Sequence, residues 1–222
     1  MKDYVQINKA VYDALAKEYA FRRDNLSEYS ESAEYLGGSL LQKVSKRDCL
    51  NVLEIGPGAG QILKYFEDNG CRTIGVELSQ EMTHLCRIQS PNSIIINGDI
   101  ADINFMPEQF DLIYMGALIH LFPVEDATTL LKNVWKWLKY DGFIFVNTTC
   151  HSISQEGFSK KKDYSKQILR FRRYWREEDF ERFISENNFS IVEKLYTYER
   201  DRRKKWVAII GKKDGIHNDE KS

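Results

Sequence analysis

Short apolar runs alternate with amphipathic segments along the middle of the chain. The apolar runs have the length of strands, and five of them follow one another at residues 52–55, 73–76, 93–96, 110–115 and 143–148. The segments between them carry apolar residues at helical spacing and predict helices over residues 59–68, 80–89 (with Ser79 as N-cap) and 124–139. Strands that alternate with helices form a parallel sheet with right-handed crossovers, so the pattern predicts an α/β fold.

Both ends of the chain add elements to this core. Before the first strand, apolar positions mark two amphipathic helices, one through Ile7, Val11, Ala14 and Leu15 and one through Ala33, Leu36, Leu40, Leu41 and Val44, with Ser30 or Ser32 able to cap the second. After it, the pattern predicts a helix over residues 177–187 and strands over residues 189–198 and 205–211. A charged turn at residues 200–204 joins these two strands, which predicts an antiparallel hairpin.

The most informative stretch is the glycine-rich turn at residues 56–60, which ends the first strand and begins a helix. Gly56, Gly58 and Gly60 permit backbone angles and a close approach that a Cβ atom would prevent. The helix that follows offers unpaired N–H groups to a polar ligand. The turn lacks the Gly-Lys-Ser/Thr ending of a phosphate-binding loop and departs from the glycine spacing of the dinucleotide fingerprint.

Three acidic residues follow three of the strands and indicate which ligand this turn binds. Glu54 lies beside the turn, where a carboxylate repels a pyrophosphate but attracts a cationic amine. Glu77 ends the second strand, where it can accept hydrogen bonds from both hydroxyls of a ribose. Asp99 follows the third strand and can accept one from an adenine amino group. An adenosine with a positively charged amino-acid tail satisfies all three.

With these motifs in order, the chain resembles the class I S-adenosylmethionine-dependent methyltransferases over nearly its whole length. The segments 110–121 and 137–144 are similar to the motifs that follow the family's fourth strand and precede its fifth, with Asp141-Gly142 in place of the more usual Pro-Gly turn. The resemblance implies a Rossmann-like, doubly wound, seven-stranded, mostly parallel sheet with an antiparallel last strand and helices on both faces. It also implies S-adenosylmethionine as cofactor and S-adenosylhomocysteine as product.

The resemblance also assigns residues to the cofactor. The glycine turn with Glu54 would hold the methionine end, Glu77 the ribose, and Asp99 with Ile100 the adenine. The full set expected to contact the cofactor is Tyr19, Arg23, Glu54, Gly56, Pro57, Gly58, Gly60, Glu77, Leu78, Met82, Gly98, Asp99, Ile100, Met115, Gly116 and Ala117. Tyr19 and Arg23 enter this set because the N-terminal helix resembles one that closes over the cofactor in small-molecule methyltransferases.

The sequence contains fewer motifs for the acceptor site than for the cofactor site. His120 follows the fourth strand at the sheet edge where ligands of open α/β folds bind, so it is the candidate general base; the alternative is a packing role. The long polar segment 151–176 is expected to form a substrate lid. The residues expected to bind the acceptor are Tyr12, Arg173, Tyr174 and Trp175. The alternatives are that Tyr12 packs a lid and that Phe171 and Trp175 belong to the core.

The net charge, the cysteine pattern and the hydropathy limit the classes of partner and location that the chain fits. The 222 residues carry a net charge of −1, so there is no global field to attract a polyanion, and a small-molecule acceptor is favoured over nucleic acid. Cys49, Cys71, Cys86 and Cys150 form no CxxC pair and no metal-spaced cluster with His, which favours reduced thiols, a cytoplasmic location and no metal. The polar N-terminus and the lack of a long apolar run argue against a membrane protein. Oligomeric state is left open.

These observations predict a methyltransferase acting on an oxygen or nitrogen of a small molecule. They divide the chain into an N-terminal helical cap (1–46), a cofactor-binding core (47–150), a lid insertion (151–176), a C-terminal helix and hairpin (177–213) and a disordered tail (214–222). One alternative is an RNA methyltransferase, with transfer RNA as the favoured target, that uses the basic residues 160–162 or 202–205. The others are a carboxylated donor and a non-catalytic cofactor-binding module.

Overall fold

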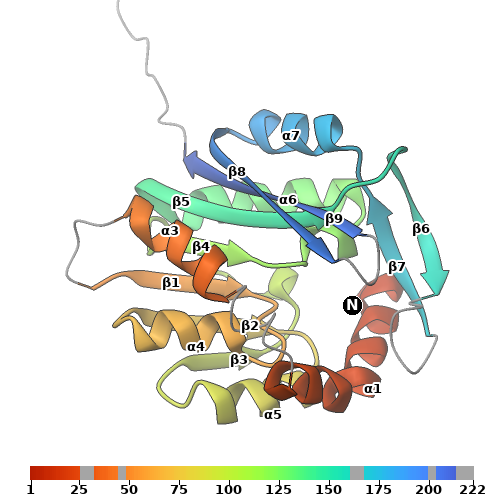
Figure 1. Ribbon diagram of the computed structural model, residues 1–222, viewed down its shortest axis with the longest axis horizontal. Coiled ribbons are helices and arrows are strands. Elements are labelled where there is room, and N and C mark those ends of the chain that lie inside the picture. The colour runs from red at the N-terminus through yellow and green to blue at the C-terminus, as the bar shows by residue number, and fades with distance from the viewer. Residues whose placement is uncertain (26–32, 45–48, 161–167, 200–203, 214–222) are drawn as a thin grey trace, which may run out of the picture.

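The structure is a computed structural model that describes residues 1–25, 33–44, 49–160, 168–199 and 204–213 (Figure 1). The side chains of residues 23, 25 and 199 lie outside this description, as do the Ser30 and Ser32 caps, the basic residues 161–162, 200 and 202–203, and the 214–222 tail. Within the described ranges, no helix has both the length and the apolar character needed to cross a membrane.

The core is one seven-stranded sheet with the strand order β3-β2-β1-β4-β5-β9-β8. The strands β1 to β5 run parallel, and β9 is antiparallel to both of its neighbours, β5 and β8. The expected doubly wound sheet with an antiparallel last strand is therefore confirmed. Its strands are β1 (Asn51–Ile55), β2 (Arg72–Glu77), β3 (Ile94–Asn97), β4 (Phe110–Met115), β5 (Leu138–Thr149), β8 (Phe189–Glu199) and β9 (Lys204–Lys213).

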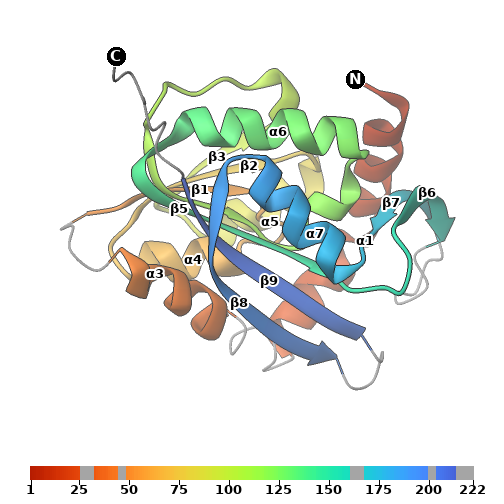
Figure 2. The ribbon, with the colours of Figure 1, turned by 90° about the horizontal axis from the view of Figure 1, so that it is seen from above.

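Helices cover both faces of this sheet (Figure 2). On one face, α6 and α7 pack on side chains such as Ile113 of β4 and Ile144 of β5. On the other, α3 and α4 pack on Leu112 and Tyr114, because successive residues of a strand point to opposite faces. The helices are α1 (Asp3–Asn25), α3 (Gly38–Lys43), α4 (Gln61–Asp68), α5 (Gln80–Gln89), α6 (Val124–Trp137) and α7 (Glu177–Glu186), with short turns η1 (Ala33–Gly37), η2 (Ile100–Asp102) and η3 (Ile119–Leu121).

Several predicted boundaries differ from the observed ones by one or more residues, and two differences are larger. The predicted tight turn at Asp141-Gly142 lies inside β5 as an irregularity, where the pairing with β4 shifts register between Phe110 and Leu112 and Asp141 has a φ of 61°. The segment after β5 is itself a small antiparallel hairpin of β6 (Gln155–Lys160) and β7 (Leu169–Tyr174). This hairpin lies beside α1 at the edge of the molecule where β4 ends (Figure 1).

Candidate functional site

A cavity of about 730 Å³ opens at the carboxyl ends of β1, β2 and β4. Along the chain, β2 and β3 extend the sheet to one side of β1, and β4 then joins it on the other side. Ligands of open α/β sheets bind at such a switch point. The α1 helix and β7 close the cavity from outside, contributing Asn8, Tyr12, Arg170 and Arg172 to its lining.

The glycine turn lines this cavity and has the backbone geometry that only glycine adopts without strain. Gly56, Gly58 and Gly60 have φ values of 73°, 55° and 86°. A Cβ atom on Gly56 would come within 2.9 Å of Leu118 Cδ1, whereas one on Gly58 would meet no atom within 4 Å. Gly58 therefore borders open space, as a turn that receives a ligand against its backbone must. Gly60 does not line the cavity but stands at the N-terminus of α4.

Glu77 ties the glycine turn to the end of β2. One of its carboxylate oxygens accepts the Gly58 N–H at 2.9 Å, and the other accepts the Ser79 N–H at 2.8 Å. Burial raises the pKa of Glu77 to about 6, although these backbone donors oppose the rise. Each carboxylate oxygen has two lone pairs, so Glu77 can still accept hydrogen bonds from a ligand in the cavity.

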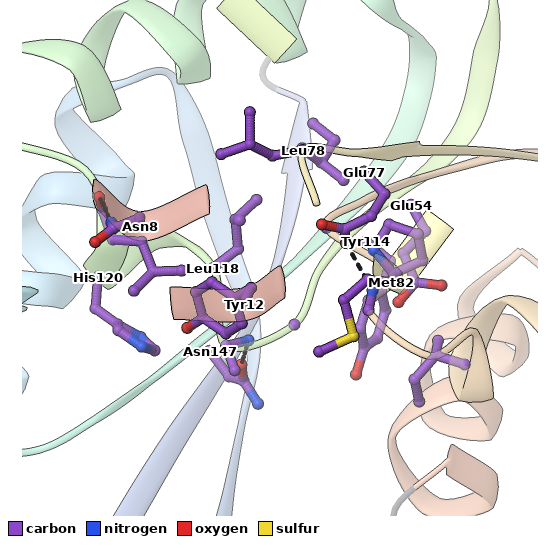
Figure 3. A pocket seen from close by; sticks show the side chains of 18 of the residues that line it. Asn8, Tyr12, Glu54, Glu77, Leu78, Met82, Tyr114, Leu118, His120 and Asn147 are labelled. Atoms are coloured by element: carbon purple, nitrogen blue, oxygen red, sulfur yellow. Dashed lines mark hydrogen bonds between the residues drawn. The ribbon is translucent and has the colours of Figure 1, made fainter. Parts of the chain in front are cut away.

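Glu54 is the most unusual group in the cavity (Figure 3). It is 3% exposed, and its Oε2 has no hydrogen-bond partner among the described residues. Burial, and secondly the charge of Glu77, raise the pKa of Glu54 to about 8. A buried carboxyl group with an unsatisfied oxygen, facing a cavity, is a site for a hydrogen-bond donor or a cation. The positively charged amino-acid tail of S-adenosylmethionine fits that requirement.

Asp99 and its neighbours form the far wall of this half of the cavity. The Asp99 carboxylate caps η2 by accepting the Ala101 N–H at 3.0 Å, and Gly98 donates to the Glu77 carbonyl at 2.9 Å. Of the expected cofactor residues, the cavity lining contains Tyr19, Glu54, Gly56, Pro57, Gly58, Glu77, Leu78, Met82, Gly98, Asp99, Ile100, Gly116 and Ala117. Gly60 and the fully buried Met115 lie outside it, and the side chain of Arg23 lies outside the described part of the chain.

The α1 helix connects the two halves of the site. Asp13 accepts a hydrogen bond from Ser79 Oγ at 2.6 Å, directly after the strand that carries Glu77. On the other side, buried Asn8 donates to the Leu121 carbonyl at 3.2 Å and accepts the Phe171 N–H at 2.9 Å. The helix therefore joins α5, η3 and β7 around the cavity.

The second half of the cavity lies around the loop that follows β4, across from Glu54 and Glu77 (Figure 3). His120 is 2% exposed, lines the cavity and meets the Trp206 ring edge-on at a centroid distance of 6.1 Å. Asn147, near the end of β5, accepts the N–H of Ala117 at 2.5 Å. Ala117 has a φ of 52°, so this hydrogen bond stabilises a strained loop that also carries Leu118 and His120.

The structure corrects the expected acceptor residues at the end of β7 and directly after it. Trp175 is 1% exposed and packs against Phe180 and Phe183 in the core. Arg173 pairs with Glu156 at 2.6 Å and stacks on Trp175, 4.1 Å from the ring centroid. Tyr174 donates to Ser159 Oγ at 2.9 Å. None of the three lines the cavity, whereas Tyr12 does.

Sequence reasoning missed the neighbours of these residues that do line the cavity. Arg170 and Arg172 share one face of β7, since residues two apart in a strand point the same way. The alternation of side chains along a strand was visible in the sequence. It identifies Arg170 and Arg172 as lining residues only once the face of β7 that lies against the cavity is known. Other lining residues that were not anticipated include Asn8, Tyr35, Tyr114, Leu118, Asn147, Thr197, Tyr198, Lys204 and Trp206.

Comparison with known proteins gives the same identification as this geometry. The family profile described as "Methyltransferase domain" matches residues 53–146, which include the glycine turn, Glu77, Asp99 and the loop after β4. The phosphoethanolamine N-methyltransferase of Plasmodium falciparum is 29% identical over 133 residues, 58% of this chain and 50% of that protein. The chain thus spans about half the length of this relative. An uncharacterized methyltransferase of Alkaliphilus oremlandii is 24% identical and aligns over 95% of this chain and 97% of its own.

Among solved structures, the fold is similar to that of the 1,6-didemethyltoxoflavin-N1-methyltransferase of Burkholderia thailandensis, which contains bound S-adenosylhomocysteine. The TM-score is 0.69 at 15% identity, covering 93% of this chain and 91% of that one. At this identity the likeness concerns the fold. The matched profile, the strand order and the cofactor motifs agree: residues 53–146 match the methyltransferase domain, and the fold is that of the class I S-adenosylmethionine-dependent methyltransferases.

Proposed function

We propose that this protein transfers the methyl group of S-adenosylmethionine to an oxygen or nitrogen of a small-molecule acceptor. The observation that carries the proposal is a single cavity with two chemically different halves. One half contains the glycine turn and the carboxylates of Glu54, Glu77 and Asp99, and the other contains His120, Asn147 and Trp206. A cavity of this size is on the scale of small-molecule sites, which span roughly 300–1,000 Å³.

In this proposal, the first half binds the cofactor. Glu54 binds the amino group, Glu77 the ribose hydroxyls, and Asp99 the adenine amino group, while Leu78 and Met82 contact its apolar parts. Bound S-adenosylmethionine supplies a methyl group that its sulfonium already activates, and S-adenosylhomocysteine remains afterwards. The task left to the protein is to align the acceptor with that methyl group and to exclude water.

His120 is the residue we propose as the general base. It belongs to η3, its ring lines the cavity opposite the carboxylates, and the ring meets Trp206 edge-on. From there it would accept the proton that a hydroxyl or amine loses as the methyl group arrives. Asn147 acts through the loop that carries His120, so it is a positioning residue.

The relatives name different acceptors, phosphoethanolamine in one and 1,6-didemethyltoxoflavin in the other, so they do not identify the acceptor of this chain. Both are small molecules, which supports a small-molecule acceptor. The carboxylate-lined half of the cavity and the net charge of −1 also weigh against a polyanionic substrate.

The first test is calorimetric titration of the wild-type protein with S-adenosylmethionine and S-adenosylhomocysteine. Micromolar binding is expected, and Glu77→Gln should weaken it by roughly tenfold or more, because hydrogen bonds to a charged acceptor are worth about 1.5–3 kcal/mol. Glu81→Gln, on the exposed first turn of α5, is the matched control and should bind like wild type. Absence of binding to the wild-type protein would refute the proposal.

His120 is tested once a screen has produced an acceptor. His120→Gln should lower kcat by roughly a hundredfold or more, in the range expected for loss of a general base, while the affinity for S-adenosylhomocysteine stays close to that of wild type. The acidic limb of the kcat–pH profile, where protonation inactivates a general base, is the second readout. Unchanged turnover in His120→Gln would remove the base role.

A further inference from the structure

Two buried oxygen atoms in the cofactor half of the cavity have no hydrogen-bond partner among the described residues. They are Glu54 Oε2, near the end of β1, and Gln61 Oε1, on the first residue of α4. Both residues line the cavity, and they flank the glycine turn at residues 56–60. A buried acceptor without a donor costs free energy, so two of them beside one cavity indicate a ligand that donates hydrogen bonds there.

The first turn of α4 brings these two acceptors to the same place. Glu54 accepts a hydrogen bond from the Leu63 backbone N–H, which belongs to this turn. Gln61 lies on the same turn, directly after Gly60, whose φ of 86° leads the chain into the helix. Both free oxygens therefore lie at the N-terminal end of α4, where the helix dipole and the unpaired N–H groups leave room for a polar ligand.

The surroundings of Glu54 favour its protonated form when no ligand is bound. The titratable groups that act on it are Glu77 of β2 and Tyr114 of β4, which lie beside it in Figure 3, and neither supplies a positive charge. Burial, and secondly the charge of Glu77, raise the pKa of Glu54 to about 8, and the Leu63 N–H opposes this rise only in part. Near pH 7 the ligand-free protein therefore carries a proton on Glu54, whereas Glu77, with a pKa of about 6, is largely ionised.

An ammonium group matches the two acceptors. It carries three N–H donors and a positive charge, so it can donate to both oxygens and form an ion pair with Glu54. The amino-acid tail of S-adenosylmethionine presents such a group, whereas its adenosine carries no charge. A positive charge beside Glu54 lowers the pKa of the carboxyl, so Glu54 loses its proton when the tail enters.

We propose that the ammonium group of the cofactor binds between Glu54 and Gln61 and displaces a proton that Glu54 carries in the ligand-free protein. The O–H bond of the Glu54 carboxyl breaks, its electron pair stays on the carboxylate, and the proton passes to the solvent. This inference rests on the proposed function and adds to it Gln61 as a binding residue and one released proton. Because binding requires the ionised carboxyl, the affinity for the cofactor should rise with pH below about pH 8.

Proton release is measured by calorimetric titration at pH 7 with S-adenosylhomocysteine, which has the same ammonium group, in buffers of different ionisation enthalpy. The slope of the binding enthalpy against the ionisation enthalpy of the buffer should correspond to roughly 0.9 protons released per ligand, the protonated fraction expected for a pKa of about 8. The dissociation constant should fall roughly eightfold between pH 6.5 and pH 7.5. The matched ligand is 5′-methylthioadenosine, which has the same adenosine and sulfur but no amino-acid tail, and it should bind without releasing a proton.

Two variants assign the effects to the two residues. Glu54→Gln cannot ionise, so it should abolish both the proton release and the dependence of the dissociation constant on pH. Gln61→Met keeps the length of the side chain but removes the acceptor, so it should weaken S-adenosylhomocysteine binding by roughly tenfold or more and leave 5′-methylthioadenosine binding unchanged. Gln80→Met is the matched control, because Gln80 is the exposed first residue of α5 and lies outside the cavity lining. It should bind both ligands like wild type.

The outcomes separate this inference from the proposed function. If S-adenosylhomocysteine binds without releasing a proton at pH 7, or if Glu54→Gln releases as many protons as wild type, the inference is refuted and the methyltransferase proposal stands. The same holds if Gln61→Met binds S-adenosylhomocysteine as tightly as Gln80→Met does, or if it weakens both ligands equally. If the wild-type protein binds neither S-adenosylmethionine nor S-adenosylhomocysteine, the proposed function fails and the inference fails with it.

Discussion

At the scale of single residues, Glu54 makes a prediction about stability. Its pKa in the folded protein is about 8, whereas a carboxyl in an unfolded chain titrates near 4.5. Between these pH values the folded state binds more protons than the unfolded state, so the free energy of unfolding falls as pH rises. Glu54→Gln removes this penalty and should raise the free energy of unfolding by roughly 2–4 kcal/mol at pH 8, with little effect at pH 4.5. Urea denaturation at both pH values measures it.

The control for Glu54→Gln is Glu81→Gln, since Glu81 is exposed on the first turn of α5. Its stability at pH 8 should be close to that of wild type. A gap between Glu54→Gln and wild type that does not grow with pH would contradict the raised pKa of Glu54.

A second residue-scale prediction uses two glycines with similar backbone angles. Gly58 and Gly70 have φ values of 55° and 78°, and a Cβ atom on either would meet no atom within 4 Å. Alanine at either position should cost about 1–2 kcal/mol of stability, because a non-glycine residue is strained there. Only Gly58 borders the cavity, so only Gly58→Ala should also weaken S-adenosylmethionine binding, by roughly tenfold or more. Equal affinities of the two variants in calorimetry would refute the placement of the cofactor against Gly58.

At the scale of elements, α1 lies against the half of the cavity proposed to bind the cofactor. Asp13 accepts from Ser79 Oγ at 2.6 Å and also pairs with Lys9 at 2.6 Å. Asp13→Ala removes the contact between α1 and the start of α5, so it should raise the dissociation constant of S-adenosylmethionine several-fold and speed amide hydrogen exchange in α1. Calorimetry and hydrogen-exchange mass spectrometry measure these effects.

Lys9→Ala is the matched variant for Asp13→Ala. It removes the Lys9–Asp13 ion pair but leaves the contact with Ser79. Partly exposed pairs four residues apart on a helix contribute about 0.3–0.5 kcal/mol, so cofactor affinity should hardly change. If both variants weakened binding equally, the ion pair rather than the docking of α1 would be responsible.

The elements also show where sequence reasoning succeeds. The helix Gln80–Gln89 and the strand Phe110–Met115 were predicted to the residue, because Ser79 is an N-cap that accepts the Met82 N–H and because the strand is buried on both faces. Of the expected cofactor residues, those after β2 and β3 and those on the glycine turn other than Gly60 line the cavity, since parallel strands end at one edge. That they bind the cofactor stays a prediction.

The β6–β7 hairpin shows why the remaining lining residues could not be predicted from the sequence. Its arginines and aromatics pointed to the correct segment but not to the correct face. Arg173 and Trp175 turn away from the cavity, and Arg170 and Arg172 turn toward it. That choice depends on the contact of β7 with Asn8 of α1, which is 163 residues distant in sequence. A local pattern carries no information about such a pairing.

At the scale of the whole molecule, the net charge and the salt dependence of binding distinguish a small-molecule acceptor from an RNA substrate. The chain has a net charge of −1, and Lys205, at the end of the basic turn, is engaged by Glu177 at 2.7 Å. Proteins that bind RNA through phosphates lose affinity steeply with salt, about 10³–10⁵-fold between 50 and 200 mM for six to ten contacts. We expect fluorescence anisotropy with labelled transfer RNA to show no saturable binding at a protein concentration of roughly 1 μM in 150 mM salt.

The matched measurement is S-adenosylmethionine binding over the same salt range. Its dissociation constant should change by less than about threefold, because the ion pairs it makes lie inside a cavity and are weakly screened. Tight transfer RNA binding with a steep salt dependence, reduced by Lys204→Ala, would reverse the choice of substrate. Lys204 lines the cavity and adjoins the basic turn in sequence, so its side chain would then bind a phosphate of the RNA backbone.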